Sequence, residues 1–316
     1  MPAELNKLVS IIIVTVGAKN YLWRCLDSVK KQTYPYLEVI VINNSSDTRL
    51  ADKVLGQLNS ARVYSPRQNL FYCASLNKGI ELSQGEFVLC LNDDIVLDKD
   101  FIQKALKGFL LKKSVGMVSG KILRQDGLTL DSTGLFLSIW RTAKERGYGQ
   151  PDSGQFEKSE VIFGVNGAAA FYRKSMLEEI REGQDYFDPD FRIFYEDLDI
   201  AWRANRYGWQ AYYIPKALAY HVRGGSFRPA SGLGKAFARR YLSDELHSDL
   251  IKNRYLAILK NETKLSLFGH LVPIILHDLC AWAYVLLFRP KALKIFLTKS
   301  KCLFRSKRSR PFRMPV

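Results

Sequence analysis

The chain has 316 residues, of which 47% are hydrophobic and 25% charged, a balance that is typical of a globular protein and excludes a mainly disordered one. This length accommodates one α/β domain of ordinary size and an additional segment. Lys and Arg number 47 against 31 Asp and Glu, so the formal net charge is +16, which favours phosphate-rich or anionic partners such as nucleotides, nucleic acids and lipid headgroups.

The amino-terminal part predicts a strand followed by a helix. Residues 1–8 lack the pattern of a secretory signal peptide, and residues 8–16 are nearly all apolar and β-branched, as in a strand covered on both faces. The following apolar residues share one helical face: Tyr21, Leu22, Cys25, Leu26 and Val29. The five cysteines include no CxxC pair, so we expect free thiols in a reducing compartment and no secretion.

The same alternation of strand and helix continues through the first third of the chain. We expect strands at residues 37–42, 62–65 and 87–91, with helices before residue 59 and at 73–82. Strand and helix in alternation predict a doubly wound, mainly parallel sheet flanked by helices. Ligands of such sheets bind beyond the carboxyl ends of the strands, so residues 15–17, 43–47 and 92–94 should surround one crevice.

Residues 115–226 mix strands, Gly-rich turns and a helix that begins near Glu196. A basic helical stretch follows at about residues 235–260, then an apolar segment at 267–288 and a basic tail.

Asn92, Asp93 and Asp94 come directly after the strand at 87–91, which places their side chains at the carboxyl edge of the sheet. Mg²⁺ and Mn²⁺ prefer oxygen ligands and often take only one or two protein carboxylates while substrate phosphates complete the shell. The alternative is a polar turn in which Asp caps a helix.

A second acidic group, Glu196 and Asp197, begins a helix. Acids are common in a first helical turn because they interact favourably with the helix dipole. Phe194 and Tyr195 before them, and Trp202 and Trp209 after them, indicate aromatic surroundings that pack against sugar rings or raise a carboxylate pKa by desolvation. A general base beside a pocket is therefore the second interpretation.

Two further segments could line a ligand-binding site. Residues 164–170, which include Gly167, are small and let the backbone approach a ligand, although tight packing explains them equally well. His221, followed by Arg223, Gly224, Gly225 and Ser226, could bind a metal or a diphosphate, although a single histidine is more often structural.

Taken in order, these segments resemble glycosyltransferase family 2, which has the GT-A fold. The resemblance covers about residues 8–226 and rests on residues 9–15, 25–28, 32–35, 37–42, 77–79, 85–88, 92–94 and 195–203.

The resemblance implies an inverting glycosyltransferase that uses a nucleotide diphosphate sugar and a divalent metal, Mg²⁺ or Mn²⁺. By this similarity Asp197 is the catalytic base, and Asp94 and His221 bind the metal. The chain departs from the family where Asn43 and Asn92 replace the usual Asp. The implied donor-binding residues are Thr15, Asn43, Asn69, Asn77, Asn92 and Asp93, and the implied acceptor or pocket residues are Gly167, Glu196 and Trp202.

The spacing of residues 69–79 and the segment 164–172 look most like the rhamnosyltransferase-like bacterial branch, which implies a deoxysugar donor such as dTDP-rhamnose. The acceptor would be a lipid-linked saccharide or a cell-surface polysaccharide. The implied organisation is a GT-A catalytic domain at 1–230, with a nucleotide-sugar half at about 1–120 and an acceptor half at about 121–230, and a basic helical extension at 231–316.

Three other classes are weighed against this interpretation. A basic nucleic-acid-binding protein would explain the charge, but the acids would repel phosphate without a metal, and no known nucleic-acid-binding module is evident, so no nucleic acid is expected. A dinucleotide oxidoreductase lacks its GxGxxG motif here. A catalytically silent nucleotide-sugar-binding relative stays open because of Asn43 and Asn92, and a homo-oligomer is also left open.

Residues 267–288 are long enough to span a bilayer but include His270, Pro273, His277 and Asp278. From Arg289 onward every charged residue is basic, a pattern that binds anionic lipid. We therefore expect a peripheral or monotopic protein on the cytoplasmic face of the cell membrane, the alternative being a buried helix pair with a solvated or oligomerising tail.

Overall fold

The computed structural model describes residues 6–17, 21–222 and 242–306. Its main sheet has the order β10-β12-β6-β11-β4-β1-β2-β3. Four neighbouring strands run parallel at one end, and β1 lies between β2 and β4: β1 (Val9–Thr15), β2 (Leu37–Asn43), β3 (Arg62–Tyr64) and β4 (Phe87–Asn92). This arrangement confirms the mainly parallel α/β sheet.

The other half of the sheet is mixed. β11 (Ala169–Arg173) is antiparallel to β4 and to β6 (Val115–Arg124). β12 (Gln210–His221) runs parallel to β6 and antiparallel to β5 (Ile95–Leu97) and β10 (Glu160–Ile162). β7 (Leu130–Ser132) pairs with β6, and β8 (Leu135–Leu137) and β9 (Ala143–Glu145) form a separate two-stranded sheet.

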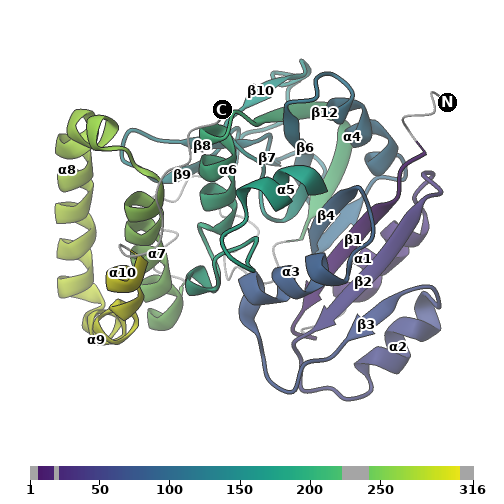
Figure 1. Ribbon diagram of the computed structural model, residues 1–316, viewed down its shortest axis with the longest axis horizontal. Coiled ribbons are helices and arrows are strands. Elements are labelled where there is room, and N and C mark those ends of the chain that lie inside the picture. The colour runs from purple at the N-terminus through teal and green to yellow at the C-terminus, as the bar shows by residue number, and fades with distance from the viewer. Residues whose placement is uncertain (1–5, 18–20, 223–241, 307–316) are drawn as a thin grey trace.

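Helices cover both faces of the main sheet, because successive side chains of a strand point to opposite faces (Figure 1). In β1, Ile11 and Ile13 pack with α1 (Tyr21–Lys30), α2 (Leu50–Gln57) and α4 (Phe101–Phe109). Ile12 and Val14 pack on the other face with α3 (Phe71–Leu82), α5 (Lys174–Ile180) and α6 (Glu196–Arg206). Every residue of β1 is buried, as the apolar run predicts.

The predicted boundaries differ by one or two residues. α3 begins at Phe71, two residues before the predicted start, and the Asn69 side chain accepts a hydrogen bond from the Phe71 backbone N–H at 2.7 Å. β3 ends at Tyr64, one residue early.

Four helices form the carboxyl-terminal extension, on one side of the sheet in Figure 1: α7 (Asp244–Asn261), α8 (Lys264–Phe288), α9 (Pro290–Lys299) and α10 (Lys301–Ser306). The predicted basic helical stretch corresponds to α7, and its residues 235–241 lie outside the described residues. Leu256 and Ala257 of α7 are buried in the same core as α6, so the extension packs directly on the helices that cover the main sheet.

Candidate active site

Three polar loops meet at the carboxyl edge of the parallel strands, as the sequence predicts. Thr15 pairs with Asn43 in the β1–β2 register, and Val14 pairs with Asn92 across β1 and β4. The Thr15 hydroxyl donates to Asp93 Oδ2 at 2.6 Å. Burial raises the pKa of Asp93 to about 6; the Thr15 hydrogen bond opposes this rise, and the neighbouring Asp94 carboxylate adds to it.

Asn43 organises the loop after β2. Its Oδ1 accepts hydrogen bonds from the backbone N–H and the hydroxyl of Ser45, at 2.9 and 2.6 Å. Its amide nitrogen donates to Ser65 Oγ at 3.2 Å and to the Asp47 carbonyl at 3.4 Å. Asn43 is buried, and its amide holds the loop at residues 43–47 in place at the carboxyl edge of the sheet.

Asp94 and His221 face each other because β12 pairs with β5, which places His221 opposite Ile95. His221 Nε2 lies 3.3 Å from Asp94 Oδ1, and its Nδ1 lies 2.8 Å from Asp131 Oδ2. Burial alone would lower the pKa of His221, but the contacts with Asp131 and Asp94 outweigh it and raise this pKa to about 9. Asp131 is fully buried and fixes the orientation of the ring.

This pair fits one side of a divalent cation site, where a bound cation would replace the proton on His221 Nε2. A carboxylate and an imidazole are suitable ligands, and a carboxylate on the far nitrogen of the histidine is the usual arrangement behind a metal-binding imidazole. Within the described ranges, no group of three His, Cys, Asp or Glu side chains is placed to hold a metal ion. A cation here would therefore need oxygen ligands from a phosphorylated substrate and water, which is common for Mg²⁺ and Mn²⁺.

Asp197 and Glu196 form an acidic pair in the first turn of α6. Asp197 Oδ2 accepts from the Gly167 N–H at 3.2 Å, and Oδ1 accepts from the Leu198 N–H at 2.8 Å. Burial raises the pKa of Asp197, although these backbone hydrogen bonds oppose the rise. Burial and then the Asp197 charge raise the pKa of Glu196 to about 8. Within the described part of the chain, Glu196 Oε2 is buried without a hydrogen-bond partner.

Tyr72 connects the acidic pair to the end of β4, the strand that Asp93 and Asp94 follow. Its hydroxyl lies 2.7 Å from Asn92 Oδ1 and 3.1 Å from the Gly167 carbonyl. The Asn92 N–H also donates to the Ala168 carbonyl at 2.9 Å. Gly167 is close to the acids, since a Cβ built there would lie 3.4 Å from Asp197 Oδ2. The two halves of the candidate site are therefore joined through Tyr72, Asn92 and Gly167.

Sequence reasoning missed Glu145 of β9, a third acid beside the pair. Asn166 Nδ2 donates to its Oε1 at 2.6 Å, and the Ser132 hydroxyl donates to its Oε2. Burial and the Asp197 charge raise the pKa of Glu145 to about 8. Asp131, behind His221, was also missed, because residues 128–134 mix apolar and polar side chains and give no signal for it.

Three predicted site residues make their described contacts away from this group. Asn77 uses its whole amide: Nδ2 donates to Asp185 Oδ1 and the Phe187 carbonyl, and Oδ1 accepts from the N–H groups of Tyr186 and Phe187. Asn69 is exposed at the start of α3. Trp202 is buried in the core, and the Arg141 guanidinium lies 5.7 Å from its ring.

The predicted aromatic surroundings of the acids are therefore only partly correct. Phe194 and Tyr195 directly precede the acidic pair, but Trp209 lies beyond the other end of α6 and donates to Glu179 at 2.9 Å. The reason is helical length: Trp209 follows Glu196 by more than three turns. Residues 223–226, predicted to follow His221 at the diphosphate, lie outside the described residues.

The sequence pattern of glycosyl transferase family 2 matches residues 10–181, more than half of the chain. The chain belongs to glycosyl transferase family 2. The match includes β1 and the Asn92–Asp94 segment, whereas α6 and the extension lie beyond its end.

Similar glycosyltransferases include synthases of polysaccharides. The poly-β-1,6-N-acetyl-D-glucosamine synthase of Staphylococcus epidermidis is 22% identical over 221 residues, which are 67% of this chain and 49% of that protein. The chondroitin synthase of Pasteurella multocida is 32% identical over 114 residues, which are 35% of this chain and 12% of that protein. The chain thus spans at most about half the length of these relatives.

Solved glycosyltransferase structures share the fold, as expected from the GT-A resemblance. GalNAc-T7 with UDP, GalNAc and Mn²⁺ superposes with a TM-score of 0.61 at 15% identity, covering 80% of this chain and 48% of that one. The mannosyltransferase PcManGT from Pyrobaculum calidifontis, in complex with GDP-Man and Mn²⁺, gives 0.55 at 18% identity, covering 93% and 74%. These likenesses show that the chain has the GT-A fold.

Proposed function

We propose that this glycosyltransferase inverts the anomeric carbon as it transfers a sugar from a nucleotide diphosphate to a saccharide hydroxyl, with Asp197 as the base. The observation that carries this proposal is the placement of two acidic groups on either side of Tyr72, next to the carboxyl edge of the parallel strands. Asp93 and Asp94 follow β4, Asp197 begins α6, and the hydroxyl of Tyr72 contacts both sides through Asn92 and Gly167.

Asp197 is held in the right state to accept a proton. The N–H groups of Gly167 and Leu198 fix its two oxygens, while burial raises its pKa and makes it more basic than an exposed Asp. The acceptor oxygen forms a bond to the anomeric carbon, its proton passes to Asp197, and the bond from that carbon to the diphosphate oxygen breaks. The nucleoside diphosphate leaves with the electron pair, and one displacement inverts the centre.

Asp94 and His221 would hold a divalent cation against the donor diphosphate, where it would neutralise the charge that develops on the leaving group. Similar folds are bound to Mn²⁺ with UDP or GDP-Man in solved structures, which supports the same class of cation and donor here. The Thr15 hydroxyl fixes Asp93 beside this site. The rhamnosyltransferase-like resemblance keeps dTDP-rhamnose among the donors to be tested.

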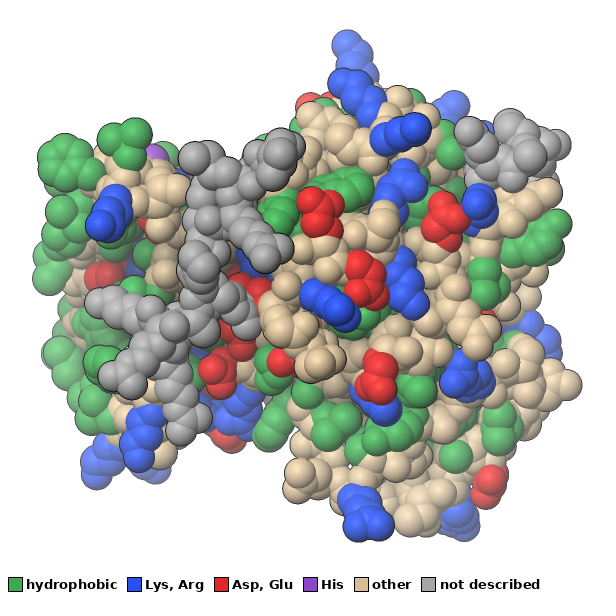
Figure 2. Space-filling view, in the orientation of Figure 1, with side chains coloured by type: hydrophobic (Ala, Val, Ile, Leu, Met, Phe, Trp, Pro, Cys, Tyr) green, Lys and Arg blue, Asp and Glu red, His purple; other side chains and the backbone are tan. Residues whose placement is uncertain are grey.

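We further propose that the acceptor is a lipid-linked or cell-surface saccharide and that the extension binds the cytoplasmic membrane surface. α8 is long and apolar enough to cross a membrane by length and composition, which is weak evidence by itself. In addition, only 17% of its most apolar window is buried, and Figure 2 shows apolar side chains gathered over the extension. The polysaccharide synthases among the relatives support such an acceptor.

A transfer assay tests the proposal. The full-length protein is incubated with UDP-, GDP- and dTDP-sugars, including dTDP-rhamnose, with Mn²⁺, Mg²⁺ or EDTA, and with lipid-linked saccharides extracted from membranes. We expect product from one donor in the presence of metal, with an inverted linkage by NMR. Donor binding without transfer for every acceptor would instead indicate a catalytically silent relative, and binding of nucleic acid alone would overturn the assignment.

A further inference from the structure

The loop before the acidic pair has an unusual backbone. Arg192, Phe194 and Tyr195 have φ values of 60°, 72° and 69°, in the left-handed region that residues with a Cβ rarely adopt. Glu196 and Asp197 follow without a break. Strained conformations persist only where the surrounding structure holds them, so the position of the acids depends on what fixes this loop.

One side chain from the extension contacts three carbonyls of the loop, whose Arg192 carbonyl also accepts hydrogen bonds from the N–H groups of Tyr72 and Cys73 at the start of α3. Asn253 of α7 is fully buried, and its amide nitrogen lies 2.7, 2.7 and 2.8 Å from the carbonyl oxygens of Phe191, Ile193 and Phe194. An amide nitrogen has two protons, so it can serve these three carbonyls only when they converge on it. The positive φ values turn the backbone so that these three carbonyls point toward the same amide nitrogen.

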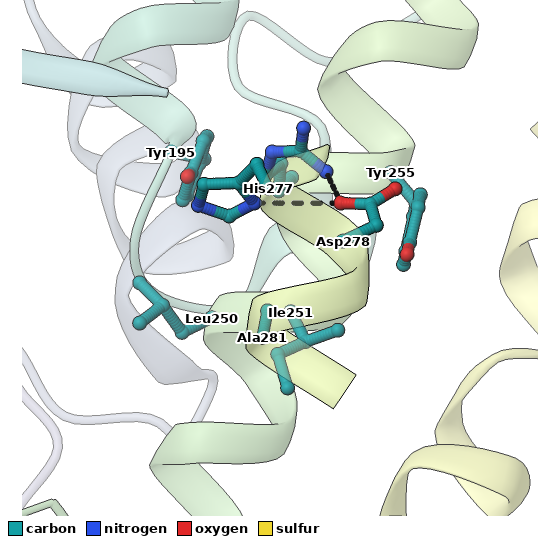
Figure 3. Close-up of a pocket in the computed structure, with 8 residues that line it drawn as sticks. Tyr195, Leu250, Ile251, Tyr255, His277, Asp278 and Ala281 are labelled. Atoms are coloured by element: carbon teal, nitrogen blue, oxygen red, sulfur yellow. Dashed lines mark hydrogen bonds and ion pairs between the residues drawn. The ribbon is translucent and has the colours of Figure 1, made fainter. Parts of the chain in front are cut away.

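The helix that carries Asn253 is itself fixed by further polar contacts at its middle and near its carboxyl end. Lys252 donates to the Asp190 carbonyl, and Lys260 near the carboxyl end of α7 pairs with Glu182 and Asp188 at 2.9 and 2.6 Å. Arg254 pairs with Asp278 of α8 beside a small pocket, into which Tyr195 of the loop also faces (Figure 3). α7 therefore cannot move relative to the loop without breaking buried polar contacts, which are costly to leave unpaired.

We infer that Asn253 is a positioning residue for catalysis: its amide holds the loop at residues 191–195 so that Asp197 points at the acceptor hydroxyl. This inference rests on the proposed role of Asp197 and extends it to a residue more than 70 positions beyond the end of the family match. The extension is then a part of the catalytic apparatus and not only an attachment to a surface.

The test compares Asn253→Ala and Asn253→Asp with the unchanged full-length protein. Alanine removes the donors and some packing, whereas aspartate keeps the shape but cannot donate when ionised. We expect kcat to fall about 10²-fold, because small displacements of a catalytic group cost rates of that order, with the KM for the donor nearly unchanged. The acidic limb of the kcat–pH profile should also move to lower pH, since a loosened loop admits water to Asp197.

Asn261→Ala is the matched control, a buried asparagine on the same helix whose amide contacts α6 and not the loop carbonyls. It should lower the melting temperature comparably while leaving kcat within about threefold of the unchanged protein, less than the effect expected from displacing the base. If the Asn253 variants are folded and keep both kcat and the pH profile, or if Asn261→Ala reproduces their kinetics, the inference is wrong. Asp197→Asn distinguishes a failure of this inference from a failure of the proposed function, because retained activity in that variant would overturn the role of Asp197 as the base.

If the variants fold poorly, hydrogen exchange replaces kinetics as the measurement. The amides of residues 192–198 should exchange faster in Asn253→Ala than in Asn261→Ala under conditions where both are mainly folded. Equal protection of these amides would contradict the inference.

Discussion

Glu196 and Asp197 are neighbours in sequence, but their surroundings assign them different roles. Two backbone N–H groups stabilise the charge of Asp197, whereas a Glu196 oxygen is buried without a partner among the described residues. Neighbouring carboxylates titrate as a pair. The first proton leaves most readily from the carboxylate whose charge is stabilised by hydrogen-bond donors. Asp197 thus carries the charge near neutral pH, and Glu196 carries the proton.

We therefore expect Asp197→Asn to abolish transfer while donor binding survives, because the amide keeps the shape but cannot accept the proton. The loss should be about 10²–10⁴-fold in kcat. Initial rates and calorimetric titration of the nucleotide measure the two quantities, and Asp126→Asn, on an exposed turn, is the control. A rate within tenfold of the unchanged protein would remove Asp197 from the mechanism.

Asp94→Ala should remove the metal-dependent part of nucleotide binding, because Asp94 and His221 supply the protein ligands of the proposed cation site. Titration of nucleoside diphosphate with and without Mn²⁺ should show a metal effect for the unchanged protein and for Asp126→Ala, and none for Asp94→Ala. An unaltered metal effect would make Asp94 a turn residue only.

Glu145 gives a prediction about stability against pH. Its folded-state pKa is about 8, above the usual 4.5, so its contribution is present below about pH 4.5 and is lost as the pH rises through 8. Glu145→Gln mimics the protonated acid and should be more stable than the unchanged protein at pH 8, on the order of 1–3 kcal/mol. Melting temperatures at pH 5 and pH 8 check this, and a gain of equal size at both pH values would contradict it.

The sequence predicted the site residues that directly follow parallel strands, because parallel strands all place their carboxyl ends at the same edge of the sheet. Thr15, Asn43 and Asp93 meet as expected for this reason. Glu145 and Asp131 were missed because β9 and β7 reach the site through antiparallel pairing in the mixed half of the fold, and short strands carry no marker of their partner. Asn253 was missed because nothing in the sequence of α7 shows which loop it contacts.

At the scale of elements, α3 lies so close to β1 that only glycine fits between them. A Cβ at Gly79 would lie 2.3 Å from Ile12 Cγ2, whereas a Cβ at Gly56 in α2 would meet nothing within 4 Å. The buried face of α3, a helix that the sequence predicts at 73–82, is set by the strand beneath it.

Gly79→Ala should therefore destabilise the protein by about 1–3 kcal/mol, because overpacking forces the helix away from the sheet. Gly56→Ala, the same change in an open helical position, should stabilise it by about 0.5–1 kcal/mol. Denaturant unfolding measures both, and similar effects for the two variants would show that α3 and β1 are not in close contact.

For the whole molecule, the net charge of +16 is distributed less simply than the sequence suggests. Arg289 and Lys299 of the basic tail pair with Asp244 and Asp249 of α7, so part of that charge is neutralised within the extension. Lys291, Lys294 and Lys301 are exposed. Because part of the basic charge is already paired, we expect membrane affinity to depend on the exposed apolar side chains of α8 as well as on the exposed lysines.

The last prediction tests this surface. Leu265, Phe268 and Val272 of α8 are 86%, 82% and 67% exposed. Their spacing places them along one side of the helix. Replacing all three with Ser should reduce co-sedimentation of the full-length protein with anionic vesicles, since each exposed apolar side chain that enters the interface contributes about 1.5–3 kcal/mol. High salt should weaken what binding is left, because the exposed lysines act through screened charge.

The matched control replaces exposed apolar residues of the catalytic half, Leu128, Ile139 and Val161, which are 72%, 56% and 53% exposed. It should sediment with vesicles as the unchanged protein does. Light scattering tests the alternative that this face of α8 is an oligomer interface. In that case the α8 variant would lose self-association while its vesicle binding stays unchanged. Equal vesicle binding by all three proteins would contradict the membrane proposal, since the most exposed apolar helix of the described chain would then contribute nothing to it.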